Sequence, residues 1–190
     1  MSEKIPSHAQ SVFRWVRFEI FQWEQELYDG SVTTFERAKF RDGSFVIPLL
    51  ADGKILLTKQ EQPARQWPFF SLPGGSFDNP DEDPLFCAKR ELFEETGYQS
   101  DEWELMRKEE GTSNIIVNTY FYIARNCQLL SDHSNPDHGE KIWLYPVTFD
   151  EFLDLALEEK FIHWNLVPLL CRAKFNREEY LSLKEKIFGK

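Results

Sequence analysis

The first third of the chain alternates apolar and polar residues with the two-residue period of half-buried β-strands. The alternation starts at Val12 and continues to about Phe21. Asp-Gly pairs between alternating runs are strong hairpin signals, and three follow at Asp29-Gly30, Asp42-Gly43 and Asp52-Gly53. The pattern therefore predicts an N-terminal antiparallel β-meander whose later strands lie at about 32–40, 44–50 and 54–60.

A helical period replaces the alternation between Pro84 and Gly97. Asp81 or Asp83 can cap the start of this helix, Pro84 suits its first turn, and Gly97 supplies a left-handed end. Its apolar residues recur every three or four positions and form one arc that faces a core, namely Leu85, Ala88, Leu92 and Thr96, with Phe86 and Phe93 further round. The stretch is therefore expected to be an amphipathic helix.

The remainder of the chain combines both periods and predicts an α+β fold. Its expected elements are strands at about 103–109, 115–124 and 141–147, followed by helices at about 148–159, 165–175 and 176–187. The second of these strands is rich in Val, Tyr and Phe, so we expect it at the centre of a sheet. Thr148 and Glu151 form a capping box, Asn176 caps the last helix, and the polar stretch 126–139 has the length of a functional loop.

The opposite face of the predicted helix carries an unusual cluster of charge. Glu91 and Glu95 are i,i+4 neighbours, Glu94 lies beside them, and Arg90 is i,i+4 to Glu94. Like charges at this spacing destabilise a helix by a few tenths of a kcal/mol, about 0.2–0.5 per pair. An ordinary acidic surface helix is one reading of the cluster. A hard divalent cation such as Mg²⁺, which prefers carboxylate oxygens and is completed by substrate phosphates, is the other.

The spacing of residues over a longer stretch favours the metal site over an ordinary acidic surface. Residues Gly75 to Tyr98 resemble the Nudix box, a glycine, a glutamate and an Arg-Glu-x-x-Glu-Glu-x-Gly run at fixed separations. Glu82, seven intervening residues and Arg90 to Tyr98 fit that pattern. The chain departs from it twice: six residues instead of five separate Gly75 from Glu82, and the last position holds Tyr98 instead of an aliphatic residue.

The resemblance implies a fold and a metal site. The fold is a Nudix-type α/β/α sandwich with a mixed sheet, preceded by the β-meander and followed by the C-terminal helices. Glu91 and Glu95 are implied as ligands of Mg²⁺, with Mn²⁺ as the alternative, and Glu94 shares the cluster. The carbonyl of Gly75 or Gly74 adds a ligand, Arg90 orients the glutamates, and Glu82 is an outer carboxylate.

A general base is also implied, because the attacking water must lose a proton. In the relatives it is often a glutamate in a late loop just before a strand, and Glu140 has that position before the strand expected at 141–147. Asp137 is the alternative. His133 and His138 lie in the same loop and are either solvated or in contact with phosphate or metal.

Sequence outside the box is similar to the ADP-ribose and nucleoside-diphosphate-sugar pyrophosphatases. The similarity rests on the run Leu57 to Ala64 and on Leu72 to Gly75. It implies a homodimer in which the N-terminal sheet is exchanged and helps to bind the nucleoside. Gln62 stands where that subfamily often has an arginine and Ser71 where it often has a glutamate, and Arg65 could replace the arginine. The chain is divided accordingly into a flexible N-terminus (1–11), a β-meander for dimerisation and substrate contact (12–53), and a hydrolase domain with C-terminal helices (54–190).

Other candidate residues have weaker support. Arg65, Arg17 and Trp23 are expected to contact substrate, and Arg14 is a further candidate for phosphate or ribose. Phe13, Trp15 and Trp23 could stack on a nucleobase or belong to a core or dimer interface. Cys87 is expected to be a small buried filler, and His163 and Trp164 to pack the start of a helix.

Composition limits the function. The 190 residues suffice for one domain, 42% are hydrophobic, and the net charge of −10 argues against nucleic-acid or anionic-membrane binding. Three cysteines without ligand spacing, and no apolar run of signal-peptide or membrane-span length, predict a cytoplasmic protein with reduced thiols.

Three functions remain open from the sequence. The first is metal-dependent hydrolysis of the diphosphate linkage in a nucleotide sugar such as ADP-ribose, giving a nucleoside monophosphate and a sugar phosphate. The second is hydrolysis of nucleoside triphosphates or dinucleoside polyphosphates, which minimal relatives perform without an N-terminal meander. The third is a non-catalytic module that senses a nucleotide, although such modules commonly lose the box glutamates that stand here at Glu91, Glu94 and Glu95.

Overall fold

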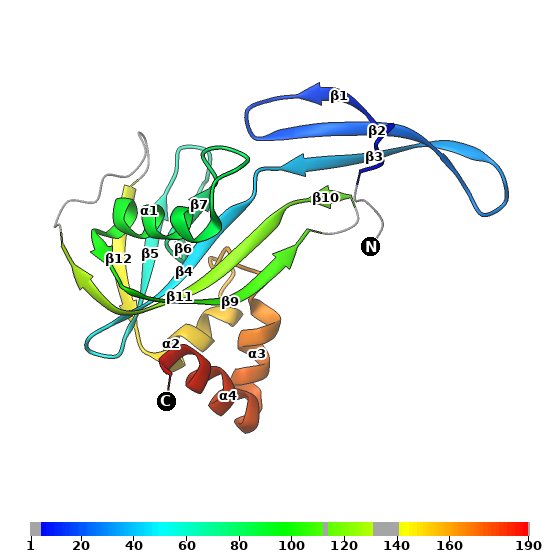
Figure 1. The fold of residues 1–190 in the computed structure, drawn as a ribbon. Helices are drawn as coiled ribbons and strands as arrows, with labels where there is room; N and C mark the ends of the chain where they lie inside the picture. The colour runs from blue at the N-terminus through cyan, green and yellow to red at the C-terminus, as the bar shows by residue number, and fades with distance from the viewer. Residues whose placement is uncertain (1–4, 112–113, 131–140, 190) are drawn as a thin grey trace.

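The chain forms two β-sheets and four α-helices in the part that the computed structural model describes, residues 5–111, 114–130 and 141–189. One sheet has eight strands and the other has four, and the chain passes between them from β3 to β4 and from β10 to β11 (Figure 1). In chain order the elements are β1 Gln10–Arg14, β2 Phe18–Glu26, β3 Val32–Phe40, β4 Gly43–Leu50, β5 Ile55–Glu61, β6 Phe69–Ser71, β7 Gly74–Ser76, α1 Pro84–Thr96, β8 Tyr98–Gln99, β9 Glu102–Glu110, β10 Ile115–Ile116, β11 Asn118–Leu129, β12 Lys141–Val147, α2 Phe149–Asp154, the 3₁₀ turn η1 Leu155–Leu157, α3 Val167–Phe175 and α4 Arg177–Phe188.

The eight-stranded sheet is mixed and forms the middle layer of the molecule. Its strands run in the order β12-β5-β4-β11-β8, with β6 on β5, β7 on β4 and β9 on β11. β4 and β11 are parallel and the other pairs are antiparallel. The expected central position of the strand rich in Val, Tyr and Phe, β11, is confirmed.

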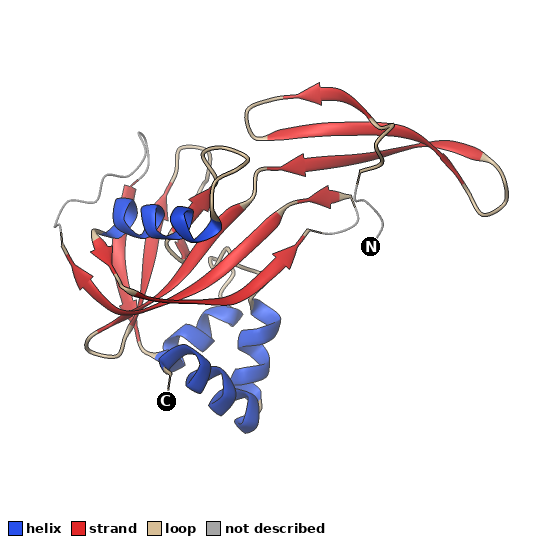
Figure 2. Ribbon diagram, in the orientation of Figure 1, coloured by secondary structure: helices blue, strands red, loops and turns tan. Residues whose placement is uncertain are grey.

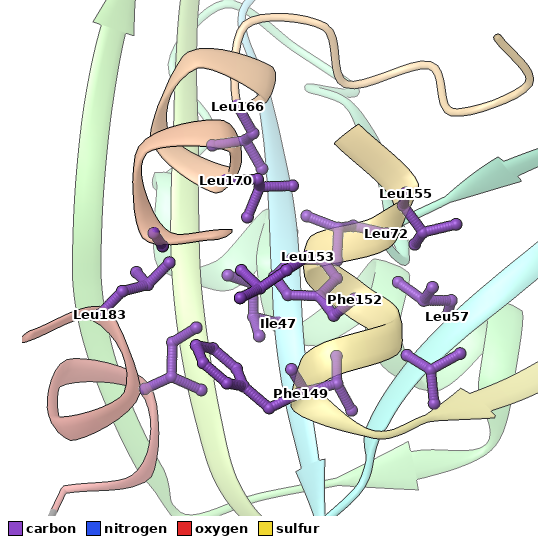
Figure 3. Close-up of a cluster of buried hydrophobic side chains, with 14 of the residues drawn as sticks. Ile47, Leu57, Leu72, Phe149, Phe152, Leu153, Leu155, Leu166, Leu170 and Leu183 are labelled. Carbon is purple, nitrogen blue, oxygen red and sulfur yellow. The ribbon is translucent and has the colours of Figure 1, made fainter. Parts of the chain in front are cut away.

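Helices cover both faces of this sheet, as predicted. α1 lies on one face, and α2, α3 and α4 lie on the other (Figure 2). On the α1 side, Leu92 packs with Val46 and Tyr122. The larger core lies on the other side, where Ile47 and Leu57 of the sheet meet Phe152 and Leu170 of the helices (Figure 3). The α+β sandwich with C-terminal helices is therefore confirmed.

The four-stranded sheet, β1-β2-β3-β10, extends away from the helices as an arm (Figure 1). One strand was predicted from Val12 to Phe21, and this prediction is wrong: β1 turns back antiparallel onto β2. The turn closes with a bond from the Trp15 amide to the Phe18 carbonyl at 3.0 Å. Because Trp15 and Val16 in the turn are themselves apolar and exposed, the alternation of the sequence continues through it without a break.

The hairpins predicted at Asp29-Gly30 and Asp52-Gly53 are confirmed by the antiparallel pairs β2–β3 and β4–β5. The hairpin predicted at Asp42-Gly43 is wrong, because β3 and β4 belong to different sheets. The Asp42 carboxylate instead accepts bonds from the Asn118 backbone and side-chain nitrogens at 2.6 and 2.7 Å. A Cβ on Gly43 would lie 2.6 Å from the Gly75 carbonyl oxygen, so this glycine permits a close approach of two backbones.

Local signals placed the helix ends well. Asp83 caps α1 by accepting from the Phe86 amide at 2.9 Å, Pro84 lies in the first turn, and Gly97 ends the helix with φ of 73°. The capping box at Thr148 and the Asn176 cap are also present. The helix expected to reach about residue 159 ends earlier, at Asp154, and continues as η1. Within the described residues, none of the helices has the length and apolar character needed to cross a membrane.

Candidate active site

α1 places its polar face toward the loop that precedes it. Cys87, Ala88 and Leu92 are buried against the sheet, so the helix cannot rotate without exposing them. This orientation leaves Arg90, Glu91 and Glu94 on the outward side and tucks Glu95 between the helix and the sheet. The predicted face of carboxylates is thus formed by one helix and fixed by its apolar arc.

Glu95 is the most buried of the three glutamates, at 8% exposed. One of its carboxylate oxygens accepts from Gln60 Nε2 at 3.1 Å, and the other accepts from the Gly74 amide at 3.0 Å. Gln60 Nε2 also donates to Thr58 Oγ1 at 3.0 Å. Strand β5, the start of β7 and the last turn of α1 therefore meet at a single carboxylate.

Arg90 lies at the centre of the acidic cluster. Its guanidinium donates to Glu91 at 2.8 Å, to Glu94 at 3.1 Å and to Glu82 at 3.2 Å. Partial burial lowers the pKa of the Arg90 guanidinium, but the hydrogen bond to Glu82 and the charge of Glu91 outweigh this effect and hold the pKa above its usual value. Arg90 is therefore permanently charged and gives four side chains of the box one shared network.

The extra residue between Gly75 and Glu82 is accommodated in a turn. The Glu82 amide donates to the Asn79 carbonyl at 3.2 Å, and the Asp81 amide donates to the Asn79 side chain at 3.1 Å. The Glu82 carboxylate still reaches Arg90, and it also accepts from the Asp78 amide at 2.6 Å. The insertion lengthens the loop without moving Glu82 away from the cluster.

Gly75 brings the backbone of β7 against the acidic face. A Cβ at this position would lie 2.5 Å from Glu91 Oε1, so any other residue here would displace the Glu91 carboxylate. Gly74 is restricted as well, because its φ is 150° and a Cβ there would lie within 2.7 Å of atoms of Ser44 and Phe45. The Gly75 carbonyl accepts a long bond from the Cys87 thiol at 3.8 Å. The backbone of β7 at Gly75 and the carboxylate of Glu91 are thus neighbours.

These donors suit Mg²⁺ or Mn²⁺ in chemical type, because they are carboxylate and carbonyl oxygens. As the side chains stand, the described residues contain no group of three His, Cys, Asp or Glu that could hold a metal ion, and Arg90 bridges Glu91 and Glu94. The backbone of β7 at Gly75 nevertheless lies against the Glu91 carboxylate, and Glu95 is fixed on the next turn of the helix. The residues therefore fit a divalent cation in the chemical type of their donors.

A cleft of about 400 Å³ opens at the end of β5, the strand that holds Gln60. Arg65, predicted to contact substrate, lies in its wall with the guanidinium 4.2 Å from the centre of the Phe69 ring. Trp67, at 66% exposed, and Lys141 line the same cleft and were not singled out from the sequence. The sequence feature that could have identified Trp67 is its position in a loop between Pro63 and Pro68.

A second cleft, of about 330 Å³, lies where the two sheets meet. Its lining is mostly apolar, from Phe40, Phe45 and Val117, and it reaches Gly75 and Ser76. Arg41 is its charged residue, with long bonds to the carbonyls of Phe77 and Asp78 at 3.5 and 3.4 Å. Sequence reasoning missed Arg41, because it follows a strand end that was read as a hairpin.

The other predicted site residues lie elsewhere or outside the described structure. Arg17 is in the turn between β1 and β2, and its carbonyl accepts from the Arg41 amide at 3.3 Å. Trp23 is on β2, 6% exposed, and packs on Phe35 with Arg37 over its ring. Both belong to the arm and not to the acidic cluster. Glu140, with Asp137, His133 and His138, lies outside the described residues.

Cys87 has the environment of a buried thiol. Burial, and then the negative charges of Glu91 and Glu82, raise its pKa to about 12. A thiol with that pKa is protonated at neutral pH and is a poor nucleophile. The prediction of a small buried filler agrees with this environment.

His163 and Trp164 differ in position although they are adjacent. His163 is buried just before α3, and its carbonyl accepts from the Leu166 amide at 2.9 Å. Trp164 is 81% exposed, so the prediction that it packs the start of a helix is wrong. A surface position for a tryptophan that adjoins a buried residue is not visible in a hydropathy pattern.

Comparisons with known proteins agree with the fold and the box. The sequence pattern of the NUDIX domain matches residues 39–170. A curated relative, the methanol dehydrogenase activator of Bacillus methanolicus, is 26% identical over 165 residues, which cover 85% of this chain and 83% of that protein. ADP-ribose pyrophosphatase of Bacillus subtilis (strain 168) is 24% identical over 150 residues, which cover 77% of this chain and 80% of that protein.

A solved structure shares the whole architecture. The crystal structure of an ADP compounds hydrolase superposes with a TM-score of 0.70, covering 95% of this chain and 97% of the other. The two sequences are 19% identical, so this likeness establishes the fold and not the substrate.

Proposed function

Because the chain belongs to the NUDIX family and is a pyrophosphohydrolase, we propose that it cleaves the diphosphate linkage of a nucleoside diphosphate joined to a sugar, with ADP-ribose as the first candidate. The products would be a nucleoside monophosphate and a sugar phosphate. The relative from Bacillus subtilis is named for ADP-ribose, and this supports the choice of substrate.

The observation that carries the proposal is the position of Glu95. A carboxylate on the last turn of α1 is held by Gln60 at 3.1 Å and by the Gly74 amide at 3.0 Å, and the next residue of β7, Gly75, lies against Glu91. A purely structural acidic surface would leave such a side chain solvated. Here the fold fixes it where hard oxygen donors converge.

We assign the metal ligands to Glu91, Glu95 and Glu94 with the carbonyl of Gly75. Mg²⁺ or Mn²⁺, when bound, supplies neutralisation of the diphosphate and a water of lowered pKa. Arg90 orients Glu91 and Glu94 by donating to both, and Glu82 holds Arg90 in place. Glu140 is assigned as the general base that takes the proton of the attacking water, on the basis of its position before β12.

Substrate binding is assigned to the cleft beside β5. Arg65 and Lys141 supply positive charge there, and Trp67 offers an exposed ring. Gln60 joins this cleft to the acidic cluster, because it precedes Glu61 of the cleft wall and donates to Glu95. Arg17 and Trp23 are assigned to substrate contact through the arm, in a second copy of the chain.

The arm supports the assignment of a homodimer. Within the described residues the helices pack on the eight-stranded sheet and the arm stands apart from them (Figure 2). Large apolar side chains are exposed on the arm, namely Val12, Phe13, Trp15, Val16, Val32, Phe35 and Phe40. An apolar surface of this kind on a two-sided sheet is typical of a protein interface.

The test is a panel of substrates incubated with the protein and Mg²⁺. It contains ADP-ribose, ADP-glucose, GDP-mannose, UDP-glucose, diadenosine polyphosphates and nucleoside triphosphates, and phosphate is measured after phosphatase coupling. We expect turnover of a diphosphate sugar that Glu95→Gln abolishes and that Glu159→Gln, a change of an exposed glutamate, retains.

The panel also separates the alternatives. Preference for triphosphates or dinucleoside polyphosphates would replace the proposed substrate with the second class. Absence of metal-dependent turnover on every compound would contradict hydrolysis of these substrates and favour a nucleotide-binding role.

A further inference from the structure

The segment between η1 and α3 forms an extra edge beside β6. The Phe70 amide donates to the Lys160 carbonyl at 2.8 Å, and the Ile162 amide donates to the Phe70 carbonyl at 3.2 Å. Phe70 and Phe161 form the corresponding parallel bridge. This pairing brings the next residue, His163, into the core and into contact with Leu72.

His163 is 4% exposed and is surrounded by aromatic rings. The centre of its imidazole lies 4.5 Å from that of Phe45, 5.5 Å from Phe161 and 5.9 Å from Phe121. Its Nε2 accepts a bond from the Leu72 amide at 3.0 Å, and Ser71 Oγ lies 3.0 Å from the same nitrogen. A histidine used only for packing would not need to direct this nitrogen at a backbone amide.

The imidazole is neutral in this position. A nitrogen that accepts from a backbone N–H carries no proton itself, so the proton is on Nδ1. Burial lowers the pKa of His163 to about 3, which agrees with the geometry. His163 Nε2 can therefore accept the hydrogen bond from the Leu72 amide throughout the neutral pH range.

The bond is one of the contacts that hold the short connection between β6 and β7. Leu72 is followed by Pro73, which lacks an N–H, so Leu72 and Gly74 supply the two amides that can hold this part of the chain. The Leu72 amide binds His163, and the Gly74 amide binds Glu95. The Pro73 carbonyl accepts from the Val46 amide at 2.9 Å.

We propose that His163 is a positioning residue of the active site: as acceptor for the Leu72 amide, it fixes the entry to β7, whose pairing with β4 then places the Gly74 amide against Glu95 and Gly75 against Glu91. The consequence for metal binding rests on the proposed function. The effect on the loop does not, because it concerns bonds within the chain. Through this contact the C-terminal third of the chain, which supplies no residue of the box, determines the shape of the site.

Two variants separate the acceptor from the packing. His163→Leu keeps much of the volume and removes the acceptor, whereas His163→Gln places an amide oxygen near the position of Nε2. Phe152→Leu is the packing control, since Phe152 is fully buried and contacts the ring of Phe161 from the other side. Glu95→Gln reports whether the glutamate site binds metal at all.

Amide hydrogen exchange and Mn²⁺ binding are measured on each variant without substrate. In His163→Leu we expect faster exchange at Leu72 and Gly74 and Mn²⁺ affinity lowered about 10-fold or more, as for other residues that orient ligands. His163→Gln restores both, and Phe152→Leu lowers the unfolding midpoint with both unchanged. Where His163→Leu does not fold, the wild-type protein decides: a scalar coupling between the Leu72 amide and His163 Nε2 supports the proposal, and a protonated Nε2 overturns it.

The proposal would also be overturned if the amides of Leu72 and Gly74 each exchanged at the same rate in the wild-type protein, in His163→Leu and in His163→Gln. Failure of the proposed function has a different signature, namely wild-type Mn²⁺ affinity that Glu95→Gln leaves unchanged. The exchange of the two amides would still decide the role of His163 in that case.

Discussion

Gln60 and Glu95 form a buried hydrogen bond of 3.1 Å that joins the middle layer of the fold to α1. Gln60 lies near the end of β5, and Glu95 lies on the last turn of α1. Because the Glu95 carboxylate also accepts from the Gly74 amide, β5 and β7 together fix its orientation.

Gln60→Ala should destabilise the protein as well as the site. Loss of a donor to a buried charged acceptor costs about 1–3 kcal/mol of unfolding free energy. Gln22→Ala is the matched control, because Gln22 donates to Glu36 at the same distance of 3.1 Å on an exposed surface. Urea denaturation of both variants measures the loss of unfolding free energy. Equal losses in the two would show that the buried Gln60 bond stabilises the protein no more than the exposed one.

Arg90→Lys should retain charge and lose function. The guanidinium reaches Glu82, Glu91 and Glu94 together, and a lysine ammonium cannot reproduce that planar arrangement. We expect kcat on the substrate identified by the panel to fall about 10–100-fold. Arg172→Lys, at an exposed pair with Glu179 at 3.9 Å, should leave kcat unchanged. A wild-type kcat in Arg90→Lys would remove the orienting role.

Acid should destabilise the protein through His163. Its folded pKa of about 3 lies below the ordinary value of 6.5, so the unfolded chain binds the proton more readily. The stabilisation is complete above pH 6.5 and is lost as the pH falls, at about 1.4 kcal/mol per unit. Denaturation between pH 7 and pH 5 measures this slope, and His163→Gln should have a shallower one. Parallel slopes in the two proteins would contradict a buried neutral imidazole.

Trp15→Ser should weaken self-association. Trp15 is 69% exposed on the arm, and loss of an aromatic anchor from an interface costs about 2 kcal/mol, or about 30-fold in the dissociation constant. Sedimentation equilibrium should show wild-type protein at twice the chain mass of 22.5 kDa and the variant shifted toward the single chain. Trp164→Ser, which removes an exposed tryptophan before α3, is the control and should stay dimeric. A wild-type protein of single-chain mass would reject the dimer.

Trp67→Ala should raise KM with little change in kcat. Its exposed ring lines the cleft beside β5, where stacking on a substrate ring contributes about 0.5–1.5 kcal/mol. The same change at Trp143, which is exposed on β12 and is not part of the cleft lining, is the comparison. An equal effect on KM in both variants would argue against binding in this cleft.

Signals that act over a few residues were read correctly from the sequence. The cap at Asp83, the left-handed Gly97 and the capping box of Thr148 each depend on neighbours within one helical turn. The acidic face of α1 followed in the same way from helical spacing. Local bonding determines these features, so one sequence suffices to predict them.

The errors have physical causes too. Asp42-Gly43 has the composition of a hairpin turn, but its glycine is needed for a close approach to Gly75 and its aspartate binds Asn118. Gln60 and His163 were not identified as site residues, because their partners Glu95 and Leu72 are 35 and 91 positions away. Contacts of this range depend on the fold and leave no mark in local spacing.

The parallel pairing of β4 with β11 has a consequence for how the chain folds. Gly43 pairs with Thr119, so the centre of the sheet closes only after a long intervening stretch has been made. The β2–β3 and β4–β5 hairpins can form early from local contacts, whereas α1 has both of its supporting strands only when β11 arrives. During synthesis α1 therefore lacks one of its supporting strands until β11 has been made. Until then the apolar side of α1 stays exposed, where chaperones can bind it or other chains can aggregate with it.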